Sequence, residues 1–135
     1  MTPFAIGRNI EAAFAEVKEQ LEQLDVSELP YVEVTNQDVY KQLDPLSCVY
    51  FLIENGKYKQ VVLYVGKTTN LRQRWKCGKR MASKQHACLD RCIDKLERRG
   101  SRIRLAWLQL ERKYLAATEM LLINLWNPPW NVQKA

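Results

Sequence analysis

Apolar residues near the N-terminus recur at steps of four and three residues, with charged or amide side chains between them. This period places them on one face of an α-helix and predicts an amphipathic helix over residues 9–24. The apolar stripe needs a partner surface, and docking on the rest of the chain is preferred over dimer formation or covering of a basic surface. Its members are Ile10, Phe14, Val17, Leu21 and Leu24.

Two β-rich apolar runs follow further along the chain. They are CVYFLI at residues 48–53 and VVLYV at residues 61–65, and the Asn55-Gly56 dipeptide between them favours a turn. The pattern predicts a β-hairpin. Residues 31–34 are a shorter strand candidate before it.

Helical and strand patterns alternate in the second half of the chain. Gly100 ends one helical pattern, and the prolines after Asn127 end another because proline cannot continue a helix. From residue 48 the order is β-β-α-α-β-α, which is typical of an α+β domain with a small sheet. The predicted elements are helices over residues 70–80, 86–99 and 112–126 and a strand over residues 102–110.

Charge is unevenly distributed along the 135 residues, whose formal net charge is +6. Residues 1–56 carry three basic and ten acidic side chains, a net charge of −7. Residues 57–113 carry seventeen basic and four acidic side chains, a net charge of +13. Lys and Arg that neutralise phosphates release condensed counterions, so the basic segment predicts a polyanionic partner, with a solvated surface as the alternative.

The N-terminus and the cysteines bear on the compartment. No secretory signal is visible and no run approaches the roughly 18 apolar residues of a membrane helix, so a cytoplasmic protein with reduced thiols and no membrane attachment is expected. Zinc binding is a weaker alternative, because the spacing of the candidate ligands fits no common zinc pattern. Those ligands are Cys77, His86, Cys88 and Cys92.

One carboxylate stands on the apolar stripe of the last predicted helix. Glu119 follows Leu115 by four residues and precedes Leu122 by three, so it faces the interior. A carboxylate there is costly unless it is paired, protonated or bound to a cation. Glu119 is therefore a candidate ligand for a divalent metal, with a structural ion pair to an arginine as the alternative.

A second group of candidates lies at the end of the predicted hairpin. Tyr50 and Tyr64 lie on its two strands, and Gly66 beside Tyr64 lets a ligand approach the backbone closely. The run KTTNLRQR at residues 67–74 places cationic donors at the same strand end, where arginine suits phosphate oxygens. Packing between strands is the alternative role of the tyrosines.

Together these residues resemble the motifs of the GIY-YIG endonuclease family, in the family's order. The resemblance covers residues 48–131, about two thirds of the chain, and five ordered motifs make it specific. The strand-end run is most similar to that of the nuclease module of UvrC, a bacterial excision-repair subunit. The matching residues are Cys48-Val49-Tyr50, Tyr64-Val65-Gly66-Lys67, Asn70-Leu71 with Arg74, Glu119, and Pro128 with Asn131.

The resemblance implies a fold and a reaction. The fold is a small three-stranded antiparallel sheet flanked by helices over residues 48–135, with residues 1–47 as an acidic extension that packs on this domain or regulates it. The reaction is phosphodiester hydrolysis in DNA with one Mg²⁺ or Mn²⁺, for which Glu119 would be the ligand. The DNA can be branched or single-stranded, RNA stays open as a substrate, and a monomer or weak dimer is expected.

The resemblance also implies residue roles. Arg74 would hold the scissile phosphate, and Asn131 would support the site by hydrogen bonding. Tyr64 would be the general base, assisted by Lys67, with Tyr50 beside it. Further contacts to the nucleic acid are expected from Arg72, Lys76, Lys79, Arg80 and Lys84.

The sequence departs from the family's pattern in three places. Cys48 replaces the glycine of the first motif, the loop ENGKYKQ is longer than usual, and Gly78 stands where many members carry a His or Tyr that assists catalysis. His86 is a candidate replacement for that side chain. Without a replacement, the alternative function is a catalytically weak or inactive nucleic-acid-binding module.

A tight turn between the two β-rich runs conflicts with a shared site. A strict two-residue turn would place Tyr50 and Tyr64 on opposite faces of the hairpin, because side chains alternate along a strand. A shared site requires both on one face. We therefore expect a wider loop or a bulge between Asn55 and Gln60.

Overall fold

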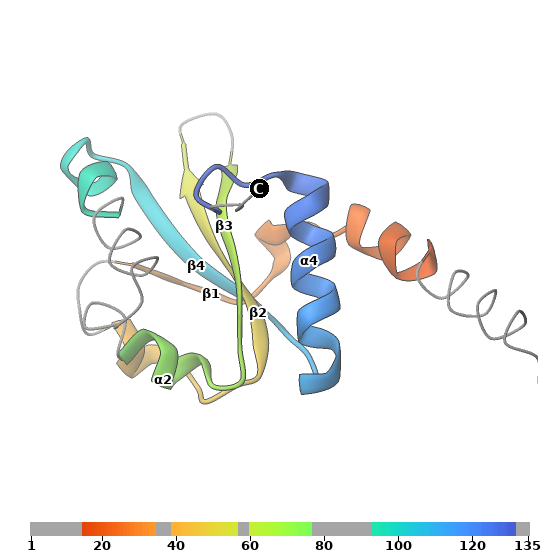
Figure 1. Cartoon of the computed structure of the whole chain (residues 1–135). Coiled ribbons are helices and arrows are strands. Elements are labelled where there is room, and N and C mark those ends of the chain that lie inside the picture. Colours follow the sequence, from red (N-terminus) through yellow and green to blue (C-terminus); the bar gives the residue numbers. More distant parts are fainter. Residues whose placement is uncertain (1–14, 35–38, 57–59, 77–92, 132–135) are drawn as a thin grey trace, which may run out of the picture.

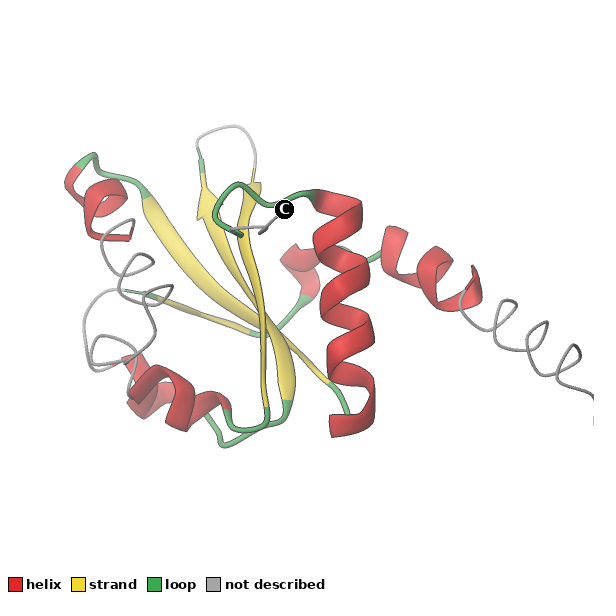
Figure 2. Cartoon of the chain, viewed as in Figure 1, coloured by secondary structure: helices red, strands yellow, loops and turns green. Residues whose placement is uncertain are grey.

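The computed structural model describes residues 15–34, 39–56, 60–76 and 93–131. They form a four-stranded antiparallel sheet in the order β1-β4-β2-β3, with helices on both faces (Figures 1 and 2). Besides helical residues 15–22 and 93–98, the elements are the 3₁₀ helices η1 (Val26–Glu28), η2 (Val39–Gln42) and η4 (Arg112–Tyr114), the strands β1 (Tyr31–Glu33), β2 (Cys48–Asn55), β3 (Gln60–Thr68) and β4 (Arg102–Gln109), and the α-helices α2 (Leu71–Lys76) and α4 (Leu115–Trp126).

The prediction of a three-stranded sheet was wrong, because β1 is a fourth strand. It pairs with β4, so that Tyr31 lies opposite Ala106 and Glu33 lies opposite Arg104. The Arg104 guanidinium stacks 4.3 Å from the centre of the Tyr31 ring and lies 3.8 Å from the Glu33 carboxylate. The strand itself was recognisable locally, but its partner lies some seventy residues further along the chain. The N-terminal segment thus completes the sheet beside β4.

The two hairpin strands are confirmed, and the loop between them is wider than a two-residue turn. Asn55 pairs with Gln60, so the loop spans four residues. Continued unchanged, this register would still leave Tyr50 and Tyr64 on opposite faces.

A bulge in the hairpin corrects the register. Leu52 pairs with Tyr64 whereas the next residue, Ile53, pairs with Val62, so Leu63 is an extra residue in β3. The extra residue shifts the alternation by one position and brings Tyr64 to the face of Tyr50. The bulge lies inside the strands, further from the turn than expected.

Two apolar clusters cover the two faces of the sheet. Side chains 48–53 of β2 are buried without alternation, because β2 is a central strand covered on both faces. On one face Tyr50, Leu52 and Tyr64 pack with Leu71 and Ile93, and we call this the α2 face. On the other, the α4 face, the members are Val49, Phe51, Ile53, Val65, Ala106, Leu115, Leu122 and Leu21.

The described helix ends follow the predicted signals. Gly100 has φ of +83°, and the amide of Ser101 donates to the carbonyl of Leu96, which closes the helix over residues 93–98. Asn127 caps α4 in a left-handed conformation just before Pro128. Of the predicted helix over residues 70–80, the part after Lys76 lies outside the described residues. No described helix is long and apolar enough to cross a membrane.

The N-terminal helix contacts the α4 face through the end of its apolar stripe. Leu21 is 7% exposed and Leu24 packs beside it, whereas Val17 is 42% exposed. Ile10 and Phe14 lie outside the described residues.

This difference in exposure predicts that shortening side chains to alanine has unequal effects at two positions of the same helix. Leu21→Ala should lower the free energy of unfolding by about 2 kcal/mol, because it removes buried methyl groups and leaves a cavity. Val17→Ala is the matched control and should change it by less than about 0.5 kcal/mol. Urea denaturation measures both. Equal effects would contradict docking of this helix through Leu21.

Candidate active site

Helix α2 begins at a well-defined cap that fixes its first turn. The Asn70 side chain accepts a hydrogen bond from the Gln73 amide at 3.0 Å, and the Leu71 amide donates to the Leu46 carbonyl at 2.9 Å. The helix carries Arg74 to the α2 face of the sheet. There the Arg74 Nε donates a long hydrogen bond of 3.4 Å to the Tyr50 hydroxyl.

Tyr50 and Tyr64 meet on this face, as the bulge requires. Their ring centres are 6.2 Å apart, and they are 1% and 4% exposed. Burial raises the pKa of both phenols, because the charged phenolate is poorly solvated there. The negative charge of Glu119 adds to this rise for both tyrosines, and the positive charge of Arg74 opposes it. Both tyrosines are therefore protonated at neutral pH.

Gly66 leaves space for the Tyr50 ring. A Cβ atom at position 66 would lie 2.5 Å from the Tyr50 Cζ and 2.6 Å from its hydroxyl oxygen. The two residues are direct cross-strand partners, so the ring lies across the glycine. The glycine is required by close packing rather than by backbone conformation.

Glu119 lies near the tyrosines although it belongs to α4. Its carboxylate is half-buried, and its charge raises the pKa of both Tyr50 and Tyr64. Burial raises the pKa of Glu119 itself, and the positive charges of Lys67 and Arg74 oppose that rise. Arg74 on α2 and Glu119 on α4 thus interact electrostatically beside the edge strand β3, although their helices cover opposite faces of the sheet.

The Glu119 carboxylate has the properties of a cation ligand. Across the described ranges it makes no hydrogen bond and no ion pair within 4 Å, so its charge is only partly compensated. The same residues contain no group of three or more His, Cys, Asp or Glu side chains that would hold a metal. Mg²⁺ needs no such cage, since it commonly binds one or two carboxylates together with waters and substrate phosphates. Glu119 therefore fits an open magnesium site.

Asn131 braces the outer edge of β3. Its Oδ1 accepts from the Val65 amide and its Nδ2 donates to the Val65 carbonyl, both at 2.9 Å. The Trp130 amide donates to the carbonyl of Leu63, the bulge residue, at 2.8 Å. The residues after α4 thus provide hydrogen-bond partners for backbone groups of β3 where the register changes. A role for Asn131 in a reaction stays a prediction.

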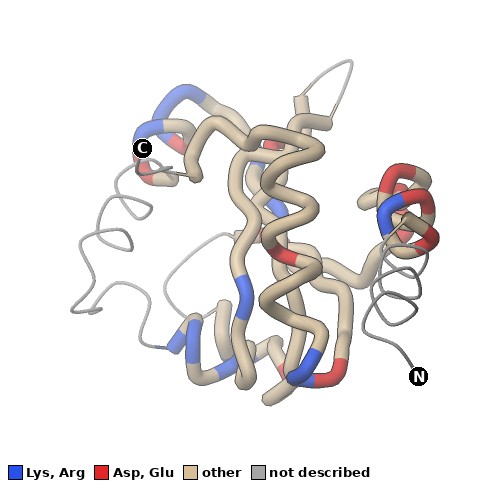
Figure 3. The backbone as a smooth tube through the Cα atoms, turned by 45° about the vertical axis from the view of Figure 1, so that its right-hand side comes forward, with Lys and Arg blue, Asp and Glu red and all other residues tan. Residues whose placement is uncertain are grey.

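The structure assembles six of the candidates and leaves others undescribed. Arg72 and Lys76 are exposed on α2, which carries blue segments in Figure 3. Among the charged residues of the N-terminal helical segment in the same figure, most are acidic. Sequence reasoning missed Trp75, although it follows the buried Leu71 by four residues and so shares its helix face. The candidates outside the described residues are Lys79, Arg80, Lys84, His86 and the possible zinc ligands Cys77, Cys88 and Cys92, together with Gly78.

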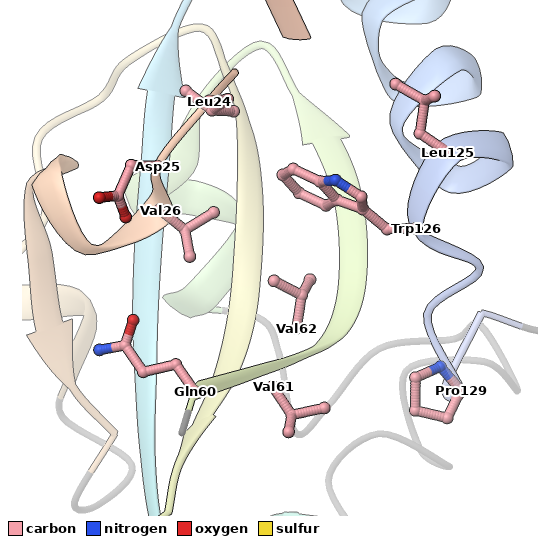
Figure 4. Close-up of a pocket in the computed structure, with 9 residues that line it drawn as sticks. All are labelled: Leu24, Asp25, Val26, Gln60, Val61, Val62, Leu125, Trp126 and Pro129. Carbon is pink, nitrogen blue, oxygen red and sulfur yellow. The ribbon is translucent and has the colours of Figure 1, made fainter. Parts of the chain in front are cut away.

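A pocket of about 720 Å³ lies apart from this group, on the α4 face. Figure 4 shows the Trp126 indole between α4 and the segment that precedes β1. None of the six candidates lines it. The pocket lining consists of Leu24, Asp25, Val26, Gln60, Val61, Val62, Leu125, Trp126 and Pro129.

The chain matches one protein-family model and is similar in fold to solved structures. The family model described as the GIY-YIG catalytic domain matches residues 46–131. Two crystal structures of the GIY-YIG N-terminal endonuclease domain of UvrC from Thermotoga maritima are similar to the chain, and both cover 73% of it and 100% of their own length. The magnesium-bound form has 19% identity and a TM-score of 0.48, and a tyrosine-to-phenylalanine mutant with its divalent cation has 19% and 0.49. A search of curated proteins finds no match.

Gly66→Ala should disrupt the tyrosine pair, because the added methyl group occupies the position of the Tyr50 ring. We expect the free energy of unfolding to fall by about 1–3 kcal/mol, as in other overpacked cores. Gly100→Ala is an instructive comparison, since its Cβ would meet nothing within 4 Å and only its positive φ is unfavourable. Near-ultraviolet circular dichroism should change for Gly66→Ala and not for Gly100→Ala. Unchanged tyrosine signals in both variants would contradict the packing.

Asn131→Ala should release the edge of β3. The Val65 amide then loses the Asn131 Oδ1 acceptor, and amide hydrogen exchange at Val65 should accelerate at least about tenfold, equivalent to roughly 1.4 kcal/mol. The Phe51 amide on the central strand β2 serves as internal reference and should change less. Equal protection of Val65 in both proteins would show that the amide is held by other contacts.

Proposed function

The chain belongs to the GIY-YIG family of catalytic domains, and on this premise we propose that it is a divalent-metal-dependent endonuclease that hydrolyses phosphodiester bonds in DNA. The proposal is supported chiefly by Glu119, a half-buried carboxylate with an elevated pKa close to two cationic side chains and two buried tyrosines. Such an arrangement is unfavourable for folding alone and suits binding of a cation and a phosphate.

Arg74 and Lys67 would bind the phosphate. Arg74 lies beside the Tyr50 hydroxyl, and both cations lie close enough to Glu119 to lower its pKa. A guanidinium held in place before the reaction stabilises the charge that develops on the phosphoryl oxygens without reorganisation. A bound Mg²⁺ or Mn²⁺ would supply Lewis-acid stabilisation of the leaving oxygen, with Glu119 as its protein ligand.

Tyr64 would accept a proton from the attacking water. Its pKa is raised by burial, further by Tyr50, whose phenolate would repel a second one, and by the negative charge of Glu119, and it is lowered by Arg74. Tyr64 can therefore act as a base only when positive charge accumulates around it. Arg74 provides part of that charge, and neutralisation of Glu119, whose own pKa Lys67 lowers, removes an opposing one. Tyr64 would therefore be able to accept a proton only once the charge of Glu119 is neutralised.

The nucleic acid would lie along the basic side of the molecule. Arg72 and Lys76 project from the helix that carries Arg74 and are exposed, so they can reach flanking phosphates. Lys79, Arg80 and Lys84 continue the same basic segment in sequence. Cytoplasmic location, the form of the DNA and a role for His86 stay predictions.

A nucleic-acid-binding module without cleavage is the competing function. Gly78 replaces a side chain that assists catalysis in many family members. The raised pKa values of the two tyrosines also favour this alternative, because a protonated phenol is a poor base. Tight, salt-dependent binding to DNA without metal-dependent cleavage would select it.

Cleavage of plasmid, branched and single-stranded DNA and of RNA, with Mg²⁺ or Mn²⁺, tests the proposal. Glu119→Gln should abolish metal-dependent cleavage, and Arg74→Ala should lower the single-turnover rate about 10²–10³-fold. Arg72→Ala, two residues away, should instead weaken binding and reduce the salt slope by about 0.9 while the rate at saturation is kept. Wild-type protein that cuts no substrate, or site variants that cut equally well, would reject the function.

The elevated pKa of Glu119 predicts the pH dependence of metal binding. The carboxyl must be deprotonated to bind a cation, so Mn²⁺ affinity should fall as pH falls through a pKa above the ordinary carboxyl value. Lys67→Met removes a charge that lowers this pKa, so the fall should begin at a higher pH than in wild type. Lys113→Met changes the net charge equally at an exposed site and should leave the profile unchanged.

Mn²⁺ titration by electron paramagnetic resonance between pH 5 and 8, without DNA, measures these profiles. Coincident profiles for Lys67→Met and Lys113→Met would contradict the assigned charge interaction.

A further inference from the structure

Trp75 touches the proposed site without belonging to it. Its ring centre lies 6.0 Å from that of Tyr50, with the two planes at 80°, an edge-to-face contact. Tyr50 is therefore enclosed by Tyr64, by Trp75 and by the backbone of Gly66. Its hydroxyl accepts the hydrogen bond from Arg74.

Trp75 also packs α2 against the sheet. The described part of α2, Leu71–Lys76, packs against the sheet, and most helical stability in proteins comes from such packing. Leu71 and Trp75 are four residues apart, so both face the sheet, and both pack in the α2-face cluster. The Asn70 cap fixes the first turn, whereas Trp75 anchors the last described turn. Rotation of this turn would redirect Arg74, which immediately precedes Trp75.

The described residues contact the indole through its ring. The ring packs edge to face on Tyr50 and lies against the α2-face cluster. Within the described ranges, the buried Nε1 atom has no hydrogen-bond partner.

We propose that Trp75 is a positioning residue that holds the Tyr50 ring against Gly66 and keeps Arg74 directed at the Tyr50 hydroxyl. The inference rests on the proposed nuclease function for its effect on rate, but not for its effect on geometry. Trp75→Leu preserves apolar contact and removes the aromatic edge, whereas Trp75→Phe preserves the edge. Trp126→Leu is the matched control, since Trp126 makes a similar ring contact of 5.7 Å with Phe51 on the opposite face of the sheet.

The first measurement is the single-turnover cleavage rate at saturating DNA. Trp75→Leu should lower it about 10–100-fold, as expected for misplacement of a phosphate-binding group, with DNA affinity within about twofold of wild type. Trp75→Phe should restore it to within about threefold. Trp126→Leu should leave the rate unchanged even if its melting temperature falls as far as that of Trp75→Leu. A rate loss equal in the two leucine variants would overturn the positioning role.

The second measurement needs neither DNA nor metal and separates this inference from the nuclease function. Solvent exchange of the Arg74 Nε–H, followed by NMR, should be faster in Trp75→Leu than in wild type and unchanged in Trp126→Leu. This pattern in a protein that cuts nothing would reject the nuclease and keep the positioning role. Unchanged exchange in Trp75→Leu overturns it whatever the activity. If Trp75→Leu does not fold, Trp75→Met replaces it in both measurements.

Discussion

The assembly of the site depends on one extra residue in β3. Next to the loop, β2 and β3 pair in a register that would separate Tyr50 from Tyr64 by the thickness of the sheet. Insertion of Leu63 moves Tyr64 to the other face, where the tyrosines meet and Arg74 reaches them. The residues after α4 contact this same stretch, through the Trp130 amide on the bulge residue and the Asn131 side chain on Val65. The segment that follows α4 therefore supports the register that brings the candidate site together.

Burial gives the assembled groups their chemical character. The two phenols and the Glu119 carboxyl all have a raised pKa because their charged forms are poorly solvated, and Lys67 and Arg74 offset only part of this for Glu119. Added positive charge would stabilise the ionised form of each group. In the proposed function, cation binding and activation of Tyr64 would be coupled through the same local electrostatics. A surface cluster of the same residues would lack this coupling, because water would screen it.

The acidic N-terminal segment and the basic segment contribute to one sheet. β1 comes from the acidic part and pairs with β4, which lies in the basic part, and Arg104 contacts both Tyr31 and Glu33 across this pair. The N-terminal helix contacts the α4 face through Leu21, away from the tyrosines. A division of the chain at residue 47 and regulation by the extension stay predictions, but residues 31–33 are part of the sheet.

Local sequence determined most of the elements and the candidate residues. The β-rich runs, the stripe that carries Glu119 and the stop at Gly100 depend on neighbours a few residues away, and the ordered motifs identified the family. Tertiary structure alone decided the partner of β1, the position of the bulge and the contact of Trp75 with Tyr50. Each of these depends on groups far apart in the chain, whose pairing is selected by burial on both faces of the sheet. The raised pKa of Glu119 has the same origin, because desolvation exists only once the surrounding elements have packed.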